Sequence, residues 1–456
     1  MKRIVCVLAA LAMMLTFTGC NVAVDMPSHL QPPRLTGEQQ AVQEQLDRYL
    51  ADKMQSQESR LKYPKGGENR SAILLTDLDG DGTDEAIAFY ATAQDETVHV
   101  HVMRRDQNNA WQSQNDIVGN STEIEEVALA DLDGDGGKEL LIGWSLYTSM
   151  DKQLTVYTDT PDGLMSAVGD MLYTAFIVGD LTDFEREDLL VLRADTNTAT
   201  VTVTLETVEA YLMKTVSTAR LDGYVQGFTD IQLAPLSDDV NALYIDCYRD
   251  TNTMLTELVY WDGEQLVSPF YNTNTNLTAG RVREVAITAA DVDGDGNLEV
   301  PSCRRLPGYE TASAASSLWL TAWTRWSISE TDQIEETTVF YSIMNLQDGY
   351  YFRLPDKYVT VGETGEIEVS LTAVYDATTR EWSLYTVEDG RINTLLLTIR
   401  AVDADAEEPD DESDGRTFKQ VAQSNAKKTV YEAWINDLVE DNDFTIRKVT
   451  YQIVVW

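Results

Sequence analysis

The stretch Asp77–Glu85, which reads DLDGDGTDE, decides the fold of this chain. Two near-copies follow it, DLDGDGGKE at Asp131–Glu139 and DVDGDGNLE at Asp291–Glu299. Each copy has acidic residues at positions 1, 3, 5 and 9 and glycines at positions 4 and 6. Carboxylates at this spacing, in a turn that glycine makes sharp, form an oxygen cage for a hard cation. Calcium is the cation that such flexible cages suit best.

In each copy we expect oxygen ligands from the side chains of positions 1, 3, 5 and 9 and from the backbone carbonyl of position 7. The loops close at position 9 and run straight into a strand, whereas EF-hand loops close at position 12 and lie between helices. Up to three structural calcium ions are therefore expected. Their predicted ligands are Asp77, Asp79, Asp81, Thr83, Glu85, Asp131, Asp133, Asp135, Gly137, Glu139, Asp291, Asp293, Asp295, Asn297 and Glu299.

The spacing of the loops indicates a repeat. Degraded copies near residues 180 and 235 fill the gap between the second and third loops, so units begin about every 54 residues. One degraded copy has Thr182 and Phe184 at positions 3 and 5 and the other begins with Pro235, so neither is predicted to bind metal. Apolar strands flank the loops and turn signals close hairpins, which gives about four strands per unit. Such small sheets bury both faces when they pack radially.

Residues 71 to about 340 resemble the FG-GAP/VCBS repeats of integrin-α-like propellers, in which a DxDxDG loop between the first two strands of a blade holds calcium. The whole layout resembles VCBS-repeat lipoproteins of Firmicutes bacteria. The resemblance implies a mainly β fold, with a β-propeller of about five four-stranded blades over 71–340. Residues 341–456 are expected to form a sheet-rich α+β domain with an acidic loop at 403–416. The alternative is that they add two blades to a seven-bladed ring.

The first residues read as a targeting segment. Lys2 and Arg3 precede an apolar run that is too short to span a bilayer convincingly. The run ends at Cys20 in a sequence that resembles a lipobox, so residues 1–19 are expected to be a lipoprotein signal peptide and Cys20 to carry lipid. Residues 20–35 would form a tether, which places the protein outside the cytoplasm, anchored to the bacterial cell membrane. A helix is predicted at 36–58, capped by Thr36 with Gln39.

The charge of the chain limits its partners. With 76 acidic and 34 basic residues the formal net charge is −42, so a nucleic-acid partner is not expected. The predicted function is a rigid binding or adhesion scaffold for an extracellular protein or glycan. The alternative is a cell-surface hydrolase or lyase that acts on carbohydrate, with acidic residues in the propeller channel.

Four further residues are weaker candidates for sites. Trp319 and Trp323 share a strand face; exposed, they would stack on sugar rings, but aromatic side chains in blade strands are more often core. His99 and His101 have a spacing that can hold zinc, with no third ligand apparent in the sequence.

Overall fold

The computed structural model is mainly β, with antiparallel sheets and few helices. The predicted signal peptide, Cys20 and the tether lie outside the described residues, as does most of the acidic loop. The structure describes residues 36–54, 59–146, 152–161, 163–167, 171–278, 282–329, 331–362, 367–405, 415–440 and 442–455.

Six sheets of four or five strands follow one another in the described part of the chain, and we number them 1 to 6. Sheet 1 contains β1 (Ser59–Leu61), β2 (Ile73–Thr76), β3 (Glu85–Thr92), β4 (His99–Arg105) and β5 (Trp111–Val118). Sheet 2 contains β6 (Ile124–Ala130), β7 (Glu139–Ser145), β8 (Lys152–Thr158), β9 (Met165–Ser166) and β10 (Met171–Tyr173). Sheet 3 contains β11 (Ala175–Gly179), β12 (Asp188–Asp195), β13 (Thr200–Glu209) and β14 (Leu212–Arg220).

Sheet 4 contains β15 (Gly227–Pro235), β16 (Asn241–Tyr248), β17 (Met254–Trp261) and β18 (Leu266–Val267). Sheet 5 contains β21 (Glu299–Arg305), β22 (Trp319–Ile328), β23 (Ile334–Asn345), β24 (Tyr350–Arg353) and β32 (Ile453–Val455). Sheet 6 contains β27 (Leu371–Asp376), β28 (Glu381–Glu388), β29 (Arg391–Asp403), β30 (Lys419–Ser424) and β31 (Thr429–Ile435). The remaining elements are the pairs β19 (Tyr271–Asn272) with β20 (Leu277–Thr278) and β25 (Val359–Val361) with β26 (Ile367–Val369), and the helices α2 (Gly37–Met54), α3 (Ile446–Gln452), η2 (Ala314–Ser316) and η3 (Asp356–Tyr358).

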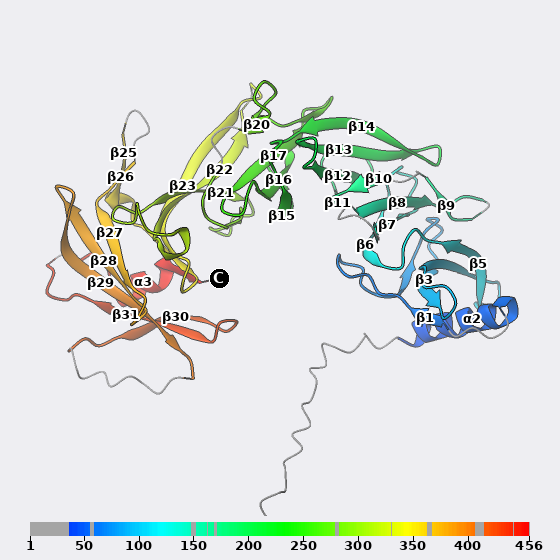
Figure 1. The fold of residues 1–456 in the computed structure, drawn as a ribbon, viewed down its shortest axis with the longest axis horizontal. Coiled ribbons are helices and arrows are strands. Elements are labelled where there is room, and N and C mark those ends of the chain that lie inside the picture. Colours follow the sequence, from blue (N-terminus) through cyan, green and yellow to red (C-terminus); the bar gives the residue numbers. More distant parts are fainter. Residues whose placement is uncertain are drawn as a thin grey trace, which may run out of the picture.

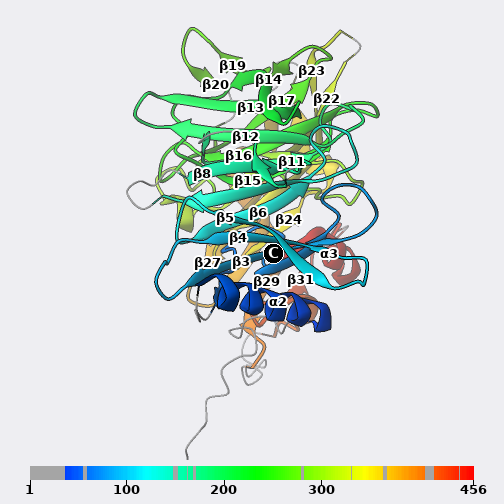
Figure 2. The same ribbon diagram turned by 90° about the vertical axis from the view of Figure 1, so that its right-hand side faces the viewer.

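Successive sheets pack face to face along an arc, and their strands lie one above another in the turned view (Figures 1 and 2). In sheets 2 to 5, alternating side chains of the central strands point to the two neighbouring sheets, so both faces of these sheets are buried. This agrees with the predicted packing of repeated small sheets. Sheets 1 and 2 share a core that includes Phe89 and Trp144, sheets 2 and 3 one with Leu141 and Leu189, and sheets 3 and 4 one with Leu190 and Ile245. The Tyr244 ring stacks on Trp326 between sheets 4 and 5, and Phe352 contacts Trp382 between sheets 5 and 6.

The predicted ring differs from the observed shape. Figure 1 shows an open arc, with α2 and sheet 1 at one end and sheet 6 at the other. The physical reason lies in α2, whose Val42, Leu46 and Leu50 pack on the face of sheet 1 that another sheet would need. The predicted helix cap is present, because the Thr36 amide donates to Gln39 Oε1 at 2.9 Å and the Gln39 amide donates to Thr36 Oγ1 at 3.3 Å.

The C-terminal region is tied closely to sheet 5. The expected boundary at residue 340 falls inside β23, and β32 pairs with β24 at the edge of the same sheet. Sheet 6 packs on sheet 5 through one continuous apolar core. Within the described ranges, no helix has both the length and the hydrophobicity needed to cross a bilayer.

Candidate metal centres

The three acidic loops occupy equivalent places in their sheets. We call them loop 1 (Asp77–Glu85, sheet 1), loop 2 (Asp131–Glu139, sheet 2) and loop 3 (Asp291–Glu299, sheet 5). In each loop the closing glutamate pairs across the ladder with the residue that precedes the loop. Each loop is therefore a turn of the same length between antiparallel segments. The prediction that apolar strands flank each loop is wrong for the segment before loop 3, because residues 285–289 form no strand and Ala290 makes only an isolated bridge to Glu299.

Hydrogen bonds to the backbone shape each loop. In loop 2, Asp131 accepts from the Gly134 amide at 2.7 Å and from the Gly136 amide at 3.0 Å. Asp291 does the same in loop 3 with Gly294 and Gly296, at 2.7 and 2.9 Å. The glycines at positions 4 and 6 have positive φ in all three loops, for example 79° and 92° in loop 2. Only glycine adopts this conformation without strain, which explains the repeated Asp-Gly-Asp-Gly pattern.

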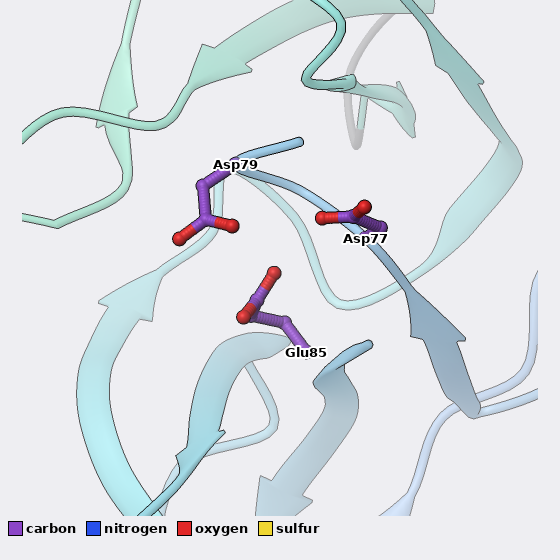
Figure 3. Close-up of side chains that lie close together, drawn as sticks. All are labelled: Asp77, Asp79 and Glu85. Carbon is purple, nitrogen blue, oxygen red and sulfur yellow. The ribbon is translucent and has the colours of Figure 1, made fainter. Parts of the chain in front are cut away.

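These turns bring carboxylates together. In loop 1 the side chains of Asp77, Asp79 and Glu85 point toward a common centre (Figure 3), and one oxygen from each lies within 4.8 Å of the others. The corresponding groups are Asp131, Asp133 and Glu139 in loop 2 and Asp291, Asp293 and Asp295 in loop 3. All the donors are oxygens, as calcium requires. The donor chemistry therefore fits the predicted ion.

Not every predicted ligand joins these groups. Asp81 and Asp135 lie outside them, and each instead accepts a hydrogen bond from the amide of position 7, at 2.7 and 2.8 Å. Glu299 also lies outside its group, because Arg325 holds it at 2.7 Å. The predicted carbonyl ligands at Thr83, Gly137 and Asn297 stay predictions.

Burial makes the closing glutamates resist ionisation in the absence of a cation. Burial raises the pKa of Glu139 to about 7, and the negative charges of Asp133 and Asp135 add to this effect. Burial also raises the pKa of Glu85 and Glu299. Each of these glutamates accepts from the amide at position 2, for example Leu132 at 2.8 Å, which fixes its carboxylate against the loop. A bound cation would offset the cost of burying this charge.

Two arginines that the sequence analysis missed contact these loops. Arg104 on β4 lies 2.9 Å from Asp79, and Arg325 on β22 lies 2.7 Å from both Asp295 and Glu299. The equivalent place beside loop 2 is taken by Thr158, which donates to Glu139 at 3.1 Å. The contact of these arginines with the loops could not be predicted from their spacing along the chain, because the length of each hairpin determines which residue lies opposite the loop.

Loops of neighbouring sheets touch one another. The Lys138 amide in loop 2 donates to the Leu78 carbonyl in loop 1 at 3.1 Å. A Cβ on Gly80 would lie 3.0 Å from the backbone of Gly136, so glycine is needed at this crossing. On its other side, loop 2 exchanges hydrogen bonds with Glu187 of the degraded copy, at 2.9 Å in each direction with Asp131. The loops of sheets 1 to 3 thus form one continuous belt.

The degraded copy at 180 replaces metal ligands with internal hydrogen bonds. Asp188 accepts from the amides of Leu181 and Thr182, both at 2.8 Å, and from the Thr182 hydroxyl at 2.9 Å. This hydrogen bonding crosses the turn. It leaves the position-9 carboxylate satisfied without a cation.

The weaker candidates have structural roles. Trp319 and Trp323 are both 2% exposed, so neither forms an open platform for a sugar. Trp323 only lines an apolar cavity of about 420 Å³ beside Asp291. His99 and His101 each lie near Asp116, with nitrogen–oxygen distances of 3.5 and 3.4 Å, yet they do not belong to the groups of converging metal ligands among the described residues.

Comparison with known proteins identifies one repeat family. The model of the FG-GAP-like repeat matches residues 77–142, which include loops 1 and 2. The chain contains an FG-GAP-like repeat. No curated protein matches.

Three solved structures show weak similarity to this chain, and these similarities carry no argument about function. A protein from Lactobacillus plantarum is 12% identical, over 74% of this chain and 86% of that one, with a TM-score of 0.29. The exotype rhamnogalacturonan lyase YesX is 10% identical, over 73% of each chain, with a TM-score of 0.29. A rhamnogalacturonan lyase from Bacillus licheniformis is 11% identical, over 72% and 74%, also with a TM-score of 0.29.

Proposed function

We propose that this protein is a calcium-binding scaffold of blade-like sheets, anchored to the outside of a bacterial membrane, that binds an extracellular protein or glycan. The observation that carries the proposal is the convergence of carboxylates at the same place in sheets 1, 2 and 5. A single acidic turn is common on protein surfaces. Three turns with the same register, the same positive-φ glycines and the same buried glutamate indicate a shared ligand.

The proposed role of calcium is structural. Without a cation, several carboxylates repel one another in each loop, and burial of the closing glutamate adds to the free energy needed to keep them charged. A bound ion would cross-link the loop and add its binding free energy to the stability of the folded chain. Because loop 1 touches loop 2 and loop 2 touches the turn of sheet 3, the ions would also stiffen the junctions between sheets. Such a chain would present a rigid surface to a partner.

Two buried acids of sheet 4 act as structural links and are closed to a substrate. Asp246 accepts from Arg283 and Thr256, both at 2.6 Å, and so ties the segment before loop 3 to sheet 4. Glu257 accepts from the Thr278 hydroxyl at 2.7 Å and from the Asp222 amide at 2.8 Å. Both side chains are buried, and each of their oxygens has a hydrogen-bond partner, as in a structural network.

Membrane attachment through Cys20 remains a proposal from the sequence. Mass spectrometry of the protein from bacterial membranes tests it, because acylation adds the mass of the lipid to a chain that begins at Cys20. An unmodified chain in the medium would contradict the anchor.

The binding role is tested with glycan arrays and with pull-downs from bacterial surface extracts, each with calcium and with excess chelator. We expect a partner that is retained with calcium and lost when the loops are emptied. Turnover of a glycan by the purified protein would contradict the scaffold and favour the hydrolase or lyase alternative.

A further inference from the structure

The three loops are nearly identical in sequence but differ in the residue beside the closing glutamate. Arg325 on β22 pairs with Glu299 in the ladder. Arg104 is one residue beyond the last residue of β4 that pairs with β3, next to Glu85, and Thr158 is one residue beyond the last residue of β8 that pairs with β7, next to Glu139. The same structural position therefore holds a cation beside loops 1 and 3 and a neutral hydroxyl beside loop 2.

We propose that Arg104 and Arg325 are built-in counter-cations that weaken calcium binding at loops 1 and 3, so that loop 2, with Thr158, is the tight site. The inference rests on the proposed calcium-binding function and deepens it. It divides three similar sites into one tight site and two weaker ones.

The contacts of Arg325 make loop 3 the weakest site. Its guanidinium lies 2.7 Å from Glu299, 2.7 Å from Asp295 and 3.2 Å from Asp293. These are three of the four predicted acidic ligands of this loop. Arginine stays protonated at every accessible pH, so the charge cannot be removed by losing a proton. An incoming calcium ion would have to displace this group or bind carboxylates that are already neutralised in part.

Arg104 makes fewer contacts with loop 1. It lies 2.9 Å from Asp79 and 3.9 Å from Glu85, and its other terminal nitrogen lies 2.8 Å from Asp159. Asp159 follows β8 of sheet 2, so Arg104 links two sheets. The second oxygen of Asp159 is buried and has no hydrogen-bond partner among the described residues. This carboxylate can therefore hold the guanidinium when calcium takes Asp79, which places loop 1 between the other two in affinity.

Loop 2 keeps its negative charge. Thr158 donates one hydrogen bond to Glu139 and carries no charge. Lys138 lies within the loop, but its ammonium is 3.6 Å from Glu187 of the neighbouring turn. A unit positive charge about 5 Å from a divalent ion, in a partly exposed site, lowers the affinity by roughly tenfold or more. Arg186 also lies beside Asp133, but its guanidinium is stacked over the Phe184 ring, 5.0 Å from the ring centre. Among the described residues no arginine forms an ion pair with the four acidic ligands of loop 2, so this loop avoids the direct contacts that loops 1 and 3 make.

The expected consequence is a graded response to calcium. The tight ion at loop 2 would sit at the centre of the belt, where that loop contacts loop 1 and the turn of sheet 3. The ions at loops 1 and 3 would bind only at higher calcium concentration and stiffen the two outer parts of the arc. The same chain would then be more flexible in dilute calcium and more rigid in concentrated calcium.

The test measures calcium affinity at each loop in the full chain. Replacing the position-1 aspartate by asparagine in two loops leaves the third intact, and calorimetric titration with calcium chloride gives its Kd. We expect loop 2 to bind at least about tenfold more tightly than loop 3. Arg325→Thr should strengthen loop 3 by a similar factor, whereas Arg325→Lys, which keeps the charge, should not. Thr158→Arg should weaken loop 2.

Arg105→Thr is the matched control. Arg105 is adjacent to Arg104 but lies 4.1 Å from the Trp111 ring centre and pairs with Glu38 at 3.0 Å. Its loss should leave all three calcium affinities unchanged. Equal Kd values in the three backgrounds, or an Arg325→Thr variant with unaltered affinity, would overturn the inference while the proposed function stands. Absence of calcium binding at every loop would overturn both.

Discussion

The contact between loops 1 and 2 predicts that two neighbouring glycines differ in their tolerance of alanine. Gly80 has a φ of 71°, and a Cβ there would lie 3.0 and 3.1 Å from the carbonyl carbon and oxygen of Gly136. Gly82 has a φ of 86°, with nothing within 4 Å of a Cβ. Both replacements incur the strain of a left-handed conformation. Only Gly80→Ala also pushes loop 2 away from loop 1.

The magnitude follows from these two costs. The left-handed conformation costs about 1–2 kcal/mol for alanine, which is the full effect expected for Gly82→Ala. Backbone displacement against Gly136 adds about 1–3 kcal/mol for Gly80→Ala, by analogy with overpacked cores. Urea unfolding in saturating calcium measures both variants. Equal losses of stability would refute the claim that loops 1 and 2 are held in contact.

Three further predictions concern other parts of the molecule. Excess chelator is expected to lower the melting temperature, since each ion present at a hundred times its Kd adds about 2.7 kcal/mol to the stability; an unchanged melt would count against bound calcium. Leu46→Ala should cost about 2–5 kcal/mol because this side chain is fully buried between α2 and sheet 1, while the exposed Lys53→Ala should cost about 0.5 kcal/mol or less in the same denaturation experiment. Burial raises the pKa of Glu257 from 4.5 to about 7, so the folded chain keeps a proton that the unfolded chain loses. The stability that this proton provides is present below about pH 4.5 and is lost as the pH rises through 7. The free energy of unfolding of wild type should therefore fall by about 3 kcal/mol more over this pH range than that of Glu257→Gln. The same pH dependence in both proteins would contradict this.

The conformation of the loops and the grouping of their carboxylates could be predicted from the sequence because both depend on residues close together in the chain. The Asp-Gly-Asp-Gly pattern predicts the positive-φ turns and the convergence of Asp77 and Asp79, and the structure has both. The helix cap at Thr36 is equally local. Repeat spacing predicts sheets of about four strands that bury both faces against their neighbours, and this is observed for sheets 2 to 5.

The pairing of strands that are distant in the chain could not be predicted from the sequence. Arg104 and Arg325 reach the loops from strands whose register against β3 and β21 depends on hairpin length. The final strand β32 joins β24 about a hundred residues earlier in the chain, so the C-terminal region could not be separated from sheet 5 at residue 340. The sequence predicts the helix and its cap, but nothing in it shows that α2 covers sheet 1 and ends the stack of sheets.

The number of calcium ions held by the full chain tests the central claim most directly. Equilibrium dialysis in millimolar calcium, followed by elemental analysis, is predicted to find three ions per chain. The triple variant Asp77→Asn, Asp131→Asn, Asp291→Asn is predicted to hold none while it retains its β-sheet circular dichroism. Wild-type protein without bound calcium, or a triple variant that binds as much as wild type, would contradict the assignment of these loops as the metal sites.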